Sequence, residues 1–438
     1  MQCLLAQAVQ KFPFAPALIA GPRTLTYAQF EQSVAAAMGR LTRLGIRPQT
    51  RVAIQSPNCP EYLILLVALW RMQAATCLLS TRLPVSALRS QTKILKCKFF
   101  FRSLKNLAAI SSGKDSPAAA LKNISLNQEV TMMLTSGSTG TPKVVVHTYG
   151  NHYYSALGSN KNIRVCPQDR WLLSLPLYHV GGLSILFRCL LAGVAMVIPD
   201  STKNLAELIR TFKITHVSVV PTQLYRLLHA QPLNLSSLKA VLVGGAPIPE
   251  NLIQKSLRRK LPIYITYGLT EMTSQVATST FADFKKHVVN SARILPYRKL
   301  KISQDGEIWV KGKTLFKRYI TPRGVTHPIK KGSWFATGDL GSFKKGRLRV
   351  WGRKDNMFIS GGENIYPEEI EKYLLNLPAI EQAIVVPEND PEFGQRPVAF
   401  IKMKKNAALN VKAIEKQLTQ FLPRFKVPAA FYHWQQDE

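Results

Sequence analysis

The chain has 438 residues, of which 46% are hydrophobic, and its 58 Lys and Arg against 25 Asp and Glu give a net charge of +33. This length predicts one large domain or two to three smaller ones, with enough apolar side chains to bury a core. The basic residues are spread along the chain without a zinc-finger, RNA-recognition or basic-zipper pattern, so we expect no nucleic-acid partner. A spread positive charge would also help to collect phosphorylated substrates.

Targeting and redox signals are weak. The N-terminal residues MQCLLAQAVQKFPF do not resemble a signal peptide, because no basic segment precedes an uninterrupted apolar one. The longest apolar runs, residues 62–70 and 183–198, are too short or too polar to span a bilayer. The six cysteines are scattered without CxxC or metal-ligand spacing, so we expect reduced thiols in a cytoplasmic protein.

Helices and strands alternate through the first two thirds of the chain. Residues 25–46 predict an amphipathic helix that begins at Thr26 and ends near Gly45, followed by a buried strand at 51–56 and a helix at 61–73. Further strands rich in Val, Leu and Ile are predicted at residues 171–177, 214–220, 239–245 and 264–268. Such strands between helices indicate a mostly parallel sheet that is covered on both faces.

The pattern changes near residue 300. Short strands with glycine turns over residues 300–352 predict an antiparallel β subdomain, and residues 357–374 predict a turn followed by a helix that begins near Pro367. We place a domain boundary here, which gives a first domain of residues 1–353 and a second domain of residues 354–438.

The most informative stretch is TSGSTGTPK, residues 135–143. It lacks the Walker A spacing, and Pro142 disfavours a helix at the residue before it, so we expect the loop to join two strands. Its glycines allow backbone N–H groups to form an anion-binding nest, to which the hydroxyls add donors and Lys143 adds a point charge. The string therefore predicts a phosphate-binding loop.

This loop resembles the phosphate loop of the adenylate-forming superfamily, which includes acyl-CoA synthetases, peptide-synthetase adenylation domains and luciferases. Further motifs of the superfamily follow in its order, namely LPLYHVGG (175–182), VGGAPI (243–248), YGLTEMTSQ (267–275), GEIWVKG (306–312), FATGDLG (335–341) and GRKDNMFISGGENIYPEEIE (352–371). The resemblance implies an α/β fold with a large N-terminal domain of two α/β subdomains plus a β subdomain. A small mobile α+β C-terminal domain would follow, with the active site between the two domains.

The resemblance also implies the chemistry. Enzymes of this superfamily join a carboxylate to the α-phosphate of ATP, giving acyl-AMP and pyrophosphate, and a thiol such as coenzyme A then displaces AMP. The chain is therefore expected to be an ATP-dependent acid–CoA ligase that uses ATP, Mg²⁺ and coenzyme A. Such a protein needs no nucleophile of its own, because it orients two anions and stabilises charge at phosphorus.

Roles carry over to the residues that match the motifs. The phosphates would be bound by Thr135, Ser136, Gly137, Ser138, Thr139, Gly140 and Lys143. Adenine and ribose would be bound by Gly244, Gly245, Ala246, Tyr267, Gly268, Asp339 and Arg353. Thr270 would touch the α-phosphate, and Glu271 would be the carboxylate ligand of Mg²⁺. Lys143, His179, Thr270 and Glu271 are the expected catalytic residues.

The remaining site residues belong to the acyl and thiol sides. The acyl pocket is expected at His179, Gly181, Gly182, Arg188, Ser274 and Gln275. His179 would place a carboxylate that is already ionised at pH 7, and the two glycines would leave room for a bulky acyl group. Arg188 is either a partner for a second substrate carboxylate or a surface cation. Asp355 and Asn356 would form the hinge, and Ser360, Gly361 and Gly362 would admit coenzyme A.

The stretch YGLTEMTSQVATS resembles the o-succinylbenzoate–CoA ligases of menaquinone biosynthesis. Their substrate, 2-succinylbenzoate, carries two carboxylates, which suits a polar wall of Thr273, Ser274 and Gln275. Medium-chain fatty acids and other aryl acids are the alternative substrates. The superfamily's P-x-x-x-x-G-K element does not follow LPRFKVP, and Lys426 is a poor substitute for its lysine by position. A shortened small domain and a degenerate nucleotide or acyl-adenylate binder are therefore also considered.

Overall fold

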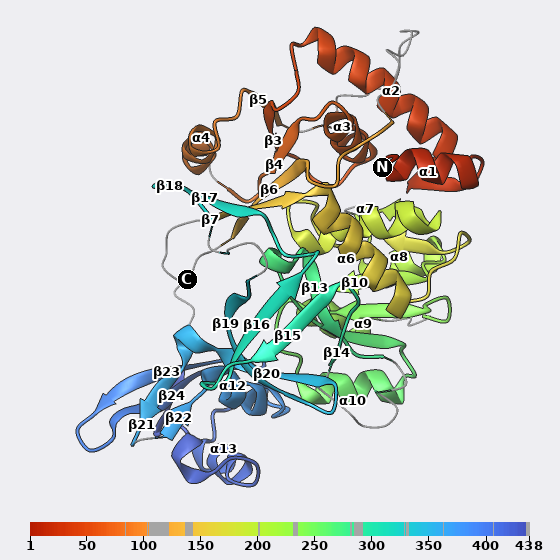
Figure 1. Ribbon diagram of the computed structural model, residues 1–438. Helices are drawn as coiled ribbons and strands as arrows, with labels where there is room; N and C mark the ends of the chain where they lie inside the picture. The colour runs from red at the N-terminus through yellow and green to blue at the C-terminus, as the bar shows by residue number, and fades with distance from the viewer. Residues whose placement is uncertain are drawn as a thin grey trace.

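A computed structural model describes residues 1–83, 85–102, 104, 122–135, 143–199, 202–230, 235–280, 283, 292–327, 329, 333–361, 363–405 and 407–434 (Figure 1). Its helices are α1 Leu4–Lys11, α2 Tyr27–Arg43, α3 Pro60–Arg71, α4 Val85–Ile94, α6 Tyr149–Asn162, α7 Val180–Ala192, α8 Leu205–Thr211, α9 Pro221–His229, α10 Glu250–Arg258, α12 Pro367–Leu375 and α13 Val411–Leu418, with short 3₁₀ turns η2 Thr270–Met272, η3 Lys354–Asn356 and η4 Arg424–Lys426.

The strands are β1 Pro16–Ala20, β2 Arg23–Thr26, β3 Arg51–Gln55, β4 Ala75–Leu78, β5 Phe99–Arg102, β6 Glu129–Thr135, β7 Lys143–Thr148, β8 Arg170–Leu172, β9 Ala195–Ile198, β10 His216–Val219, β11 Ala240–Val243, β12 Ile263–Leu269, β13 Ser274–Thr278, β14 Ala292–Ile294, β15 Arg298–Ile302, β16 Glu307–Gly312, β17 Arg318–Thr321, β18 Gly324–Thr326, β19 Phe335–Lys344, β20 Arg347–Arg353, β21 Phe358–Ser360, β22 Glu363–Ile365, β23 Ile380–Asp390, β24 Gly394–Met403 and β25 Ala430–His433.

Two large sheets form the N-terminal part. One sheet has the strand order β18-β17-β7-β6-β4-β3-β5, in which β5, β3, β4 and β6 are parallel and β7, β17 and β18 continue antiparallel. The other runs β15-β16-β19-β20-β14-β13-β12-β11-β10-β8-β9-β1-β2 and is parallel from β1 to β12. From β13 onward its strands are antiparallel. The predicted fold class, two α/β parts plus an antiparallel β part, is confirmed.

Local sequence signals explain most element boundaries. The helix predicted to begin at Thr26 does so, because the Thr26 side chain accepts a hydrogen bond from the Gln29 amide at 3.2 Å while the Gln29 side chain accepts one from the Thr26 amide. The strands predicted near 214–220 and 239–245 are β10 and β11. The helix predicted near Pro367 is α12, with proline in its first turn.

The strand predicted at 171–177 is too long, since β8 ends at Leu172. Beyond that residue the side chain of Asn58 replaces a neighbouring strand. Its amide donates to the carbonyls of Leu173 and Leu175, and its oxygen accepts from the Leu177 amide. A single side chain from a distant turn thus satisfies the backbone that the apolar pattern assigned to a sheet.

The small C-terminal part lies at one end of the molecule (Figure 1). It combines the hairpin β21–β22, the sheet β23-β24-β25 and helices α12 and α13 around an apolar core of its own. The side-chain oxygen of Asn376 accepts from the backbone amides of Glu250 and Asn251, at 2.7 and 3.3 Å, and so caps α10 of the large part. The boundary expected between residues 353 and 354 falls where β20 gives way to η3, and it stays a prediction.

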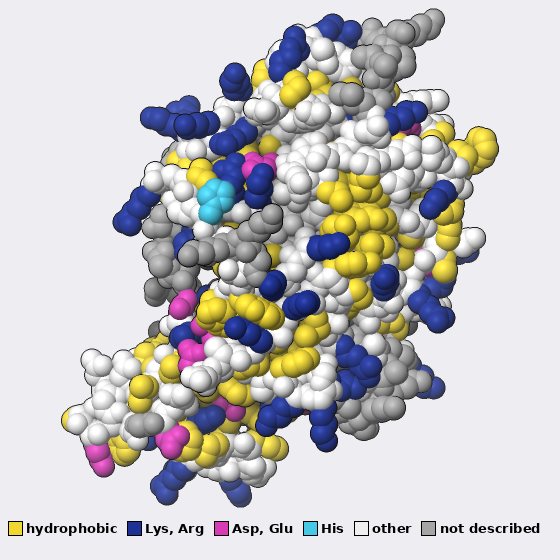
Figure 2. Space-filling model, in the orientation of Figure 1, with side chains coloured by type: hydrophobic (Ala, Val, Ile, Leu, Met, Phe, Trp, Pro, Cys, Tyr) yellow, Lys and Arg dark blue, Asp and Glu magenta, His cyan; other side chains and the backbone are white. Residues whose placement is uncertain are grey.

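The surface is basic throughout the visible face. Figure 2 shows Lys and Arg side chains scattered over it, with Asp and Glu gathered at a few points only. In the described part of the chain, no helix is long and apolar enough to cross a membrane. The sequence and the surface thus agree that the charge is dispersed.

A buried ion pair joins α2 to α3. The Arg71 guanidinium, 1% exposed, donates to both carboxylate oxygens of Glu31 at 2.7 Å each. Breaking such a pair leaves an uncompensated buried charge, which costs about 3–5 kcal/mol. A second pair, Arg23 with Glu61 at 2.9 Å, is much more exposed and serves as its control.

We expect Glu31→Ala to lower the free energy of unfolding by about 3–5 kcal/mol, because Arg71 stays buried without its partner. Arg23→Ala should lower it by less than about 1 kcal/mol, since an exposed pair contributes little. Urea denaturation of both variants beside the unmodified chain measures the difference. Equal effects of the two substitutions would contradict the importance of the buried pair.

Candidate active site

The ends of the predicted phosphate loop lie at the end of a β-hairpin. Strands β6 and β7 are antiparallel, Thr135 pairs with Lys143, and the Thr135 hydroxyl donates to the Lys143 carbonyl at 3.3 Å. The prediction that the loop joins two strands is confirmed. Residues 136–142, which include Ser136, Gly137, Ser138, Thr139 and Gly140, lie outside the described residues, so their phosphate-binding role stays a prediction.

Glu271 lies in the short turn η2, which is held from three sides. The Thr270 carbonyl accepts a hydrogen bond from His147 Nε2 at 2.7 Å, and the Glu271 carbonyl accepts one from the Phe316 amide at 2.8 Å. The hydroxyl of Tyr319 donates to Glu271 Oε1 at 2.8 Å. These contacts leave Glu271 Oε2 for a further ligand.

Tyr319 connects Glu271 with the end of the phosphate loop. The Nζ atom of Lys143 lies 5.9 Å from the centre of the Tyr319 ring, whose hydroxyl holds Glu271. Burial, and then the neighbouring Glu271 charge, raise the pKa of Tyr319, so the phenol remains a donor. The expected phosphate lysine and the expected metal carboxylate therefore contact one residue that sequence reasoning missed. Nothing in its local pattern separates it from other strand tyrosines.

Two buried histidines support the turn from behind. Because the Thr270 carbonyl can only accept, His147 Nε2 carries the proton, and its Nδ1 accepts from the Thr131 hydroxyl at 3.2 Å. The same hydroxyl accepts from His152 Nε2 at 2.8 Å. Burial lowers the pKa of His147 to about 4, so this chain of hydrogen bonds is neutral at physiological pH.

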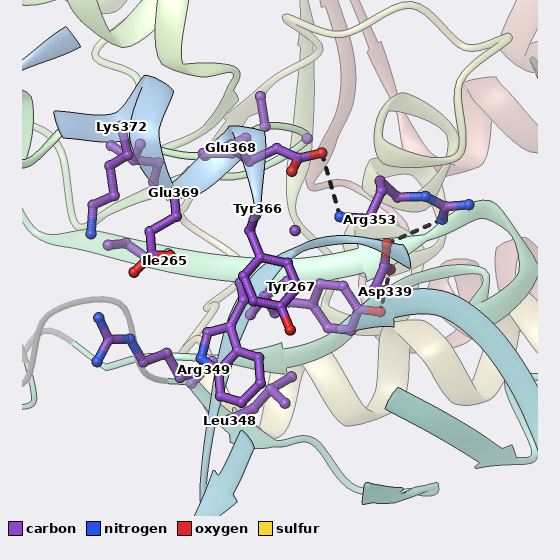
Figure 3. Close-up of a pocket in the computed structure, with 18 of the residues that line it drawn as sticks. Ile265, Tyr267, Asp339, Leu348, Arg349, Arg353, Tyr366, Glu368, Glu369 and Lys372 are labelled. Atoms are coloured by element: carbon purple, nitrogen blue, oxygen red, sulfur yellow. Dashed lines mark hydrogen bonds and ion pairs between the residues drawn. The ribbon is translucent and has the colours of Figure 1, made fainter. Parts of the chain in front are cut away.

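A cavity of about 710 Å³ lies between the antiparallel strands and the small C-terminal part (Figure 3). Six residues of the expected nucleotide site line it, namely Gly245, Ala246, Tyr267, Gly268, Asp339 and Arg353. Gly244 precedes them and packs against Thr266, where a Cβ would lie 2.5 Å from the Thr266 methyl group. The structure thus brings together residues that are more than 100 positions apart.

Asp339 organises one wall of this cavity. Its Oδ2 accepts a hydrogen bond from the Tyr267 hydroxyl at 2.6 Å, and its Oδ1 accepts one from Arg353 Nη1 at 3.1 Å (Figure 3). Burial raises the pKa of Asp339, while the Tyr267 and Arg353 contacts oppose that rise. Gly338, at φ +74°, leaves the room that the Arg353 guanidinium occupies. Two hydrogen-bond donors therefore fix the orientation of the Asp339 carboxylate, which is the expected ribose acceptor.

The motif roles left out other residues that line the cavity, namely Trp351, Tyr366, Glu368, Lys372 and Lys426. Figure 3 shows Tyr366, Glu368 and Lys372 among them. The rings of Trp351 and Tyr366 lie 6.1 Å apart, and Lys426 forms an ion pair with Glu369 at 2.6 Å. Lys426, judged a poor substitute by its position in the sequence, does face the cavity. Only the fold places the small domain's cations there.

Arg188 is not a surface cation, because only 1% of it is exposed. Its Nη2 donates to Gln275 Oε1 at 2.9 Å, and its guanidinium lies 5.4 Å from the centre of the Trp171 ring. Its Nε and Nη1 atoms are buried without a hydrogen-bond partner. The surface-cation alternative is therefore wrong, and the guanidinium has donors to spare.

The other expected acyl-pocket residues are distributed over α7 and β13. His179 is exposed at the start of α7, where partial burial and the charge of Arg82 lower its pKa. Gly182 differs from the expectation, because a Cβ there would overlap the Pro176 and Leu175 carbonyls, so backbone fills its space. Gly181 is freer, with only a Leu175 methyl group nearby. Ser274 follows the turn at φ +94°.

The hinge and tunnel residues flank β21. Asp355 pairs with Arg353 at 3.1 Å, and the Asn356 amide donates to Glu368 Oε1 at 2.6 Å. Ser360 is buried, and Gly361, at φ +56°, packs where a Cβ would lie 2.7 Å from the Phe393 ring. Gly362 lies outside the described residues. The hinge and tunnel roles stay predictions.

Comparison with known sequences now decides the family. The model of the AMP-binding enzyme family matches residues 5–320, and that of the AMP-binding enzyme C-terminal domain matches residues 369–437. The chain belongs to the AMP-binding enzyme family. As in that family, the nucleotide-site candidates lie between the large and small parts of the chain.

This AMP-binding enzyme is similar to several 2-succinylbenzoate–CoA ligases. It is 34% identical to the 2-succinylbenzoate–CoA ligase of Bacillus mycoides, over 92% of this chain and 88% of the relative. It is 36% identical to that of Salmonella typhimurium, over 90% and 85%. The o-succinylbenzoate CoA synthetase of Bacillus subtilis, solved with the acyl-adenylate OSB-AMP, superposes with a TM-score of 0.90 at 28% identity, covering 100% and 95% of the two chains.

A metal ion at this AMP-binding enzyme's site would rely on few protein ligands. Within the described ranges, no three His, Cys, Asp or Glu side chains gather as a metal cluster. That suits Mg²⁺, which commonly takes one or two carboxylates and completes its shell with phosphate and water oxygens. The B. subtilis synthetase has also been solved with ATP and magnesium, at a TM-score of 0.86 and 30% identity over 99% of this chain and 96% of that one.

We expect Tyr319→Phe to lower kcat/KM for ATP and Mg²⁺ by about 10–100-fold, because a hydrogen bond to a charged group contributes about 1.5–3 kcal/mol. Pyrophosphate release during titrations of Mg²⁺ and ATP measures it. The control is Tyr432→Phe, which removes another Tyr–Glu hydrogen bond, to Glu388 at 3.3 Å on the exposed small domain. Matching titration curves for both variants would rule out the positioning of Glu271 by Tyr319.

Proposed function

We propose that this chain is a 2-succinylbenzoate–CoA ligase that uses ATP, Mg²⁺ and coenzyme A. In the first step a substrate carboxylate attacks the α-phosphate of ATP, forming acyl-AMP and releasing pyrophosphate. In the second step the thiol of coenzyme A takes the acyl group and releases AMP. The proposal rests on the family, on the relatives named above, and on one feature of the acyl side.

That feature is the buried guanidinium of Arg188. Its Nε and Nη1 atoms lack partners, and no acidic side chain of the described residues forms an ion pair with it. Burial lowers its pKa to about 10, which still leaves it charged at pH 7. A buried cation is costly unless an anion pairs with it. A substrate with two carboxylates supplies that anion, because one is activated and the other remains.

The first step would be supported by Lys143, Thr270 and Glu271. Lys143 would offer a point charge to the terminal phosphates, and Thr270 would contact the α-phosphate. Glu271 is a hard oxygen donor that fits Mg²⁺, and a bound Mg²⁺ would neutralise phosphate charge and orient the leaving pyrophosphate. Tyr319 and His147 keep this turn in place through the hydrogen bonds described above.

The nucleoside would occupy the cavity between the two parts of the chain. Its volume of about 710 Å³ lies within the range of small-molecule sites. Asp339 would accept from the ribose hydroxyls with lone pairs that Tyr267 and Arg353 do not use. The rings of Tyr267, Tyr366 and Trp351 offer apolar faces for the base.

His179 would place the carboxylate that is activated. Its lowered pKa keeps it neutral at pH 7, so it can donate one hydrogen bond without holding a carboxylate as tightly as a cation would. For the second step the small domain would turn about Asp355 and Asn356 and bring Ser360 and Gly361 towards the acyl-adenylate. Gly361 suits such an approach because it carries no side chain.

We expect pyrophosphate release from ATP and Mg²⁺ with 2-succinylbenzoate, and acyl-CoA when coenzyme A is added. Arg188→Met should raise KM for this acid about 10–100-fold, since a charge-assisted hydrogen bond contributes about 1.5–3 kcal/mol. Arg188→Lys should raise this KM by a smaller factor, because it keeps the charge. The assay is pyrophosphate release across a panel of aryl and medium-chain fatty acids.

Release only with fatty acids, or an unchanged KM in Arg188→Met, would refute the proposed substrate. ATP binding without pyrophosphate release from any acid would instead identify a nucleotide binder that has lost adenylation. These outcomes can be distinguished, because ATP binding and pyrophosphate release are measured independently.

A further inference from the structure

A second arginine lies buried behind the acyl side. Arg298, the first residue of β15, is 6% exposed. Its Nε donates to the Gln275 carbonyl at 2.5 Å, its Nη1 to the Pro296 carbonyl at 2.8 Å, and its Nη2 to the Ser155 hydroxyl at 3.0 Å. All its partners are neutral oxygens.

Gln275 links the two arginines. Arg298 binds its backbone carbonyl, while Arg188 binds its side-chain oxygen at 2.9 Å. The side-chain nitrogen of Gln275 donates to the Thr278 hydroxyl at 2.7 Å, which fixes the amide with its oxygen towards Arg188. The position of Arg188 therefore depends on a glutamine that Arg298 holds from the other side.

The pair carries two buried positive charges without a carboxylate. Burial, followed by the charge of Arg188, lowers the pKa of Arg298 to about 9, and no carboxylate of the described residues acts on either guanidinium. The buried Arg71 shows the ordinary arrangement, because Glu31 binds it through both oxygens. Two buried guanidinium groups on the same glutamine are costly unless an anion such as a ligand carboxylate neutralises them.

The cluster lies next to the cavity wall. Gln275 pairs with Gly268 across β12 and β13, and Gly268 lines the cavity described above. The chain also makes room for Arg298, since a Cβ at Gly158 would lie 2.5 Å from its Nη1 and 2.8 Å from the Pro296 carbonyl. The absence of a side chain at Gly158 thus makes room for the Arg298 guanidinium. Arg298 binds Gln275 on β13, and the neighbouring strand β12 lines the nucleotide cavity through Gly268.

We propose that Arg298 is a positioning residue for substrate specificity, which holds Gln275 and Arg188 towards the second carboxylate of a dicarboxylic acid and adds a second buried charge for that carboxylate to neutralise. This inference rests on the proposed function and extends it to a residue that does not itself touch the substrate. An acid with one carboxylate leaves both cations uncompensated, so the pair favours dicarboxylic acids over apolar ones of the same size.

The test compares 2-succinylbenzoate with 4-oxo-4-phenylbutanoate and 2-butanoylbenzoate, each of which lacks one carboxyl group. Pyrophosphate release gives kcat and KM for each acid with the unmodified chain, Arg298→Gln and Arg298→Lys. We expect Arg298→Gln to lower kcat/KM for 2-succinylbenzoate at least tenfold, mainly through KM. For the monocarboxylate that is still activated, we expect a change below about threefold, because a neutral tail gains little from the buried charge. Arg298→Lys keeps the charge, so its kcat/KM for 2-succinylbenzoate should lie between those of the unmodified chain and Arg298→Gln.

A purely structural Arg298 would lower kcat/KM for both acids by the same factor, and that result would overturn the inference. Gly158→Ala gives a second variant, in which the charge stays but the guanidinium is displaced, and we expect the same selective loss at smaller size. If Arg298→Gln fails to fold, Gly158→Ala provides the test. An unchanged ratio of kcat/KM for 2-succinylbenzoate to kcat/KM for the monocarboxylate in Gly158→Ala would equally overturn the inference. Failure of the unmodified chain to activate 2-succinylbenzoate would overturn the proposed function, and with it this extension, whereas an active chain with unchanged selectivity overturns only the role of Arg298.

Discussion

The candidate site depends on the junction between the two large sheets. His147 on β7 and Tyr319 on β17 belong to one sheet, while the turn Thr270–Met272 joins β12 to β13 of the other. Two hydrogen bonds across this junction, to the Thr270 carbonyl and the Glu271 carboxylate, fix the turn relative to the hairpin that carries the phosphate loop. The distance between the ends of the expected phosphate loop and the expected metal carboxylate is thereby set by rigid strands.

Positive side chains are compensated in different ways at the surface and in the core. Lys and Arg side chains are numerous on the visible surface (Figure 2), and solvent and salt screen their charges at little cost. In the core, Arg71 is neutralised by Glu31, whereas no carboxylate of the described residues forms an ion pair with Arg188 or Arg298, which contact neutral oxygens and the Trp171 ring. Evolution tolerates an unpaired buried charge chiefly where a ligand completes the pair. This contrast within one chain supports the proposed roles of Arg188 and Arg298 in substrate recognition and of Arg71 in stability.

Much of the site could be anticipated because its residues occur in short motifs. The loop between strands was predicted from its own string, and the grouping of Tyr267, Asp339 and Arg353 from the resemblance that their motifs carry. Tyr319 and Arg298 could not be anticipated, since each acts through a contact with a residue at least 23 positions away, and neither lies in a distinctive string. The same limit explains the strand that was predicted too long after Leu172, because Asn58 intervenes from 115 positions away. Gly182 differs for a local reason, since the backbone of Leu175 and Pro176 fills its space.

The small domain is held in its present orientation by polar contacts and not by a large apolar seam. Asn376 caps α10, Lys354 pairs with Asp305 at 2.6 Å, and Glu368 Oε1 accepts a hydrogen bond from the Arg353 amide at 3.4 Å. Hydrogen bonds of this kind exchange readily with water, so each contributes only about 0.5–1.5 kcal/mol to the orientation. The apolar core of the small domain is separate from those of the large one. A rotation about Asp355 and Asn356 would therefore cost a few polar contacts and leave the apolar cores of the described residues intact, which is the energetic condition for the domain rotation proposed between the two chemical steps.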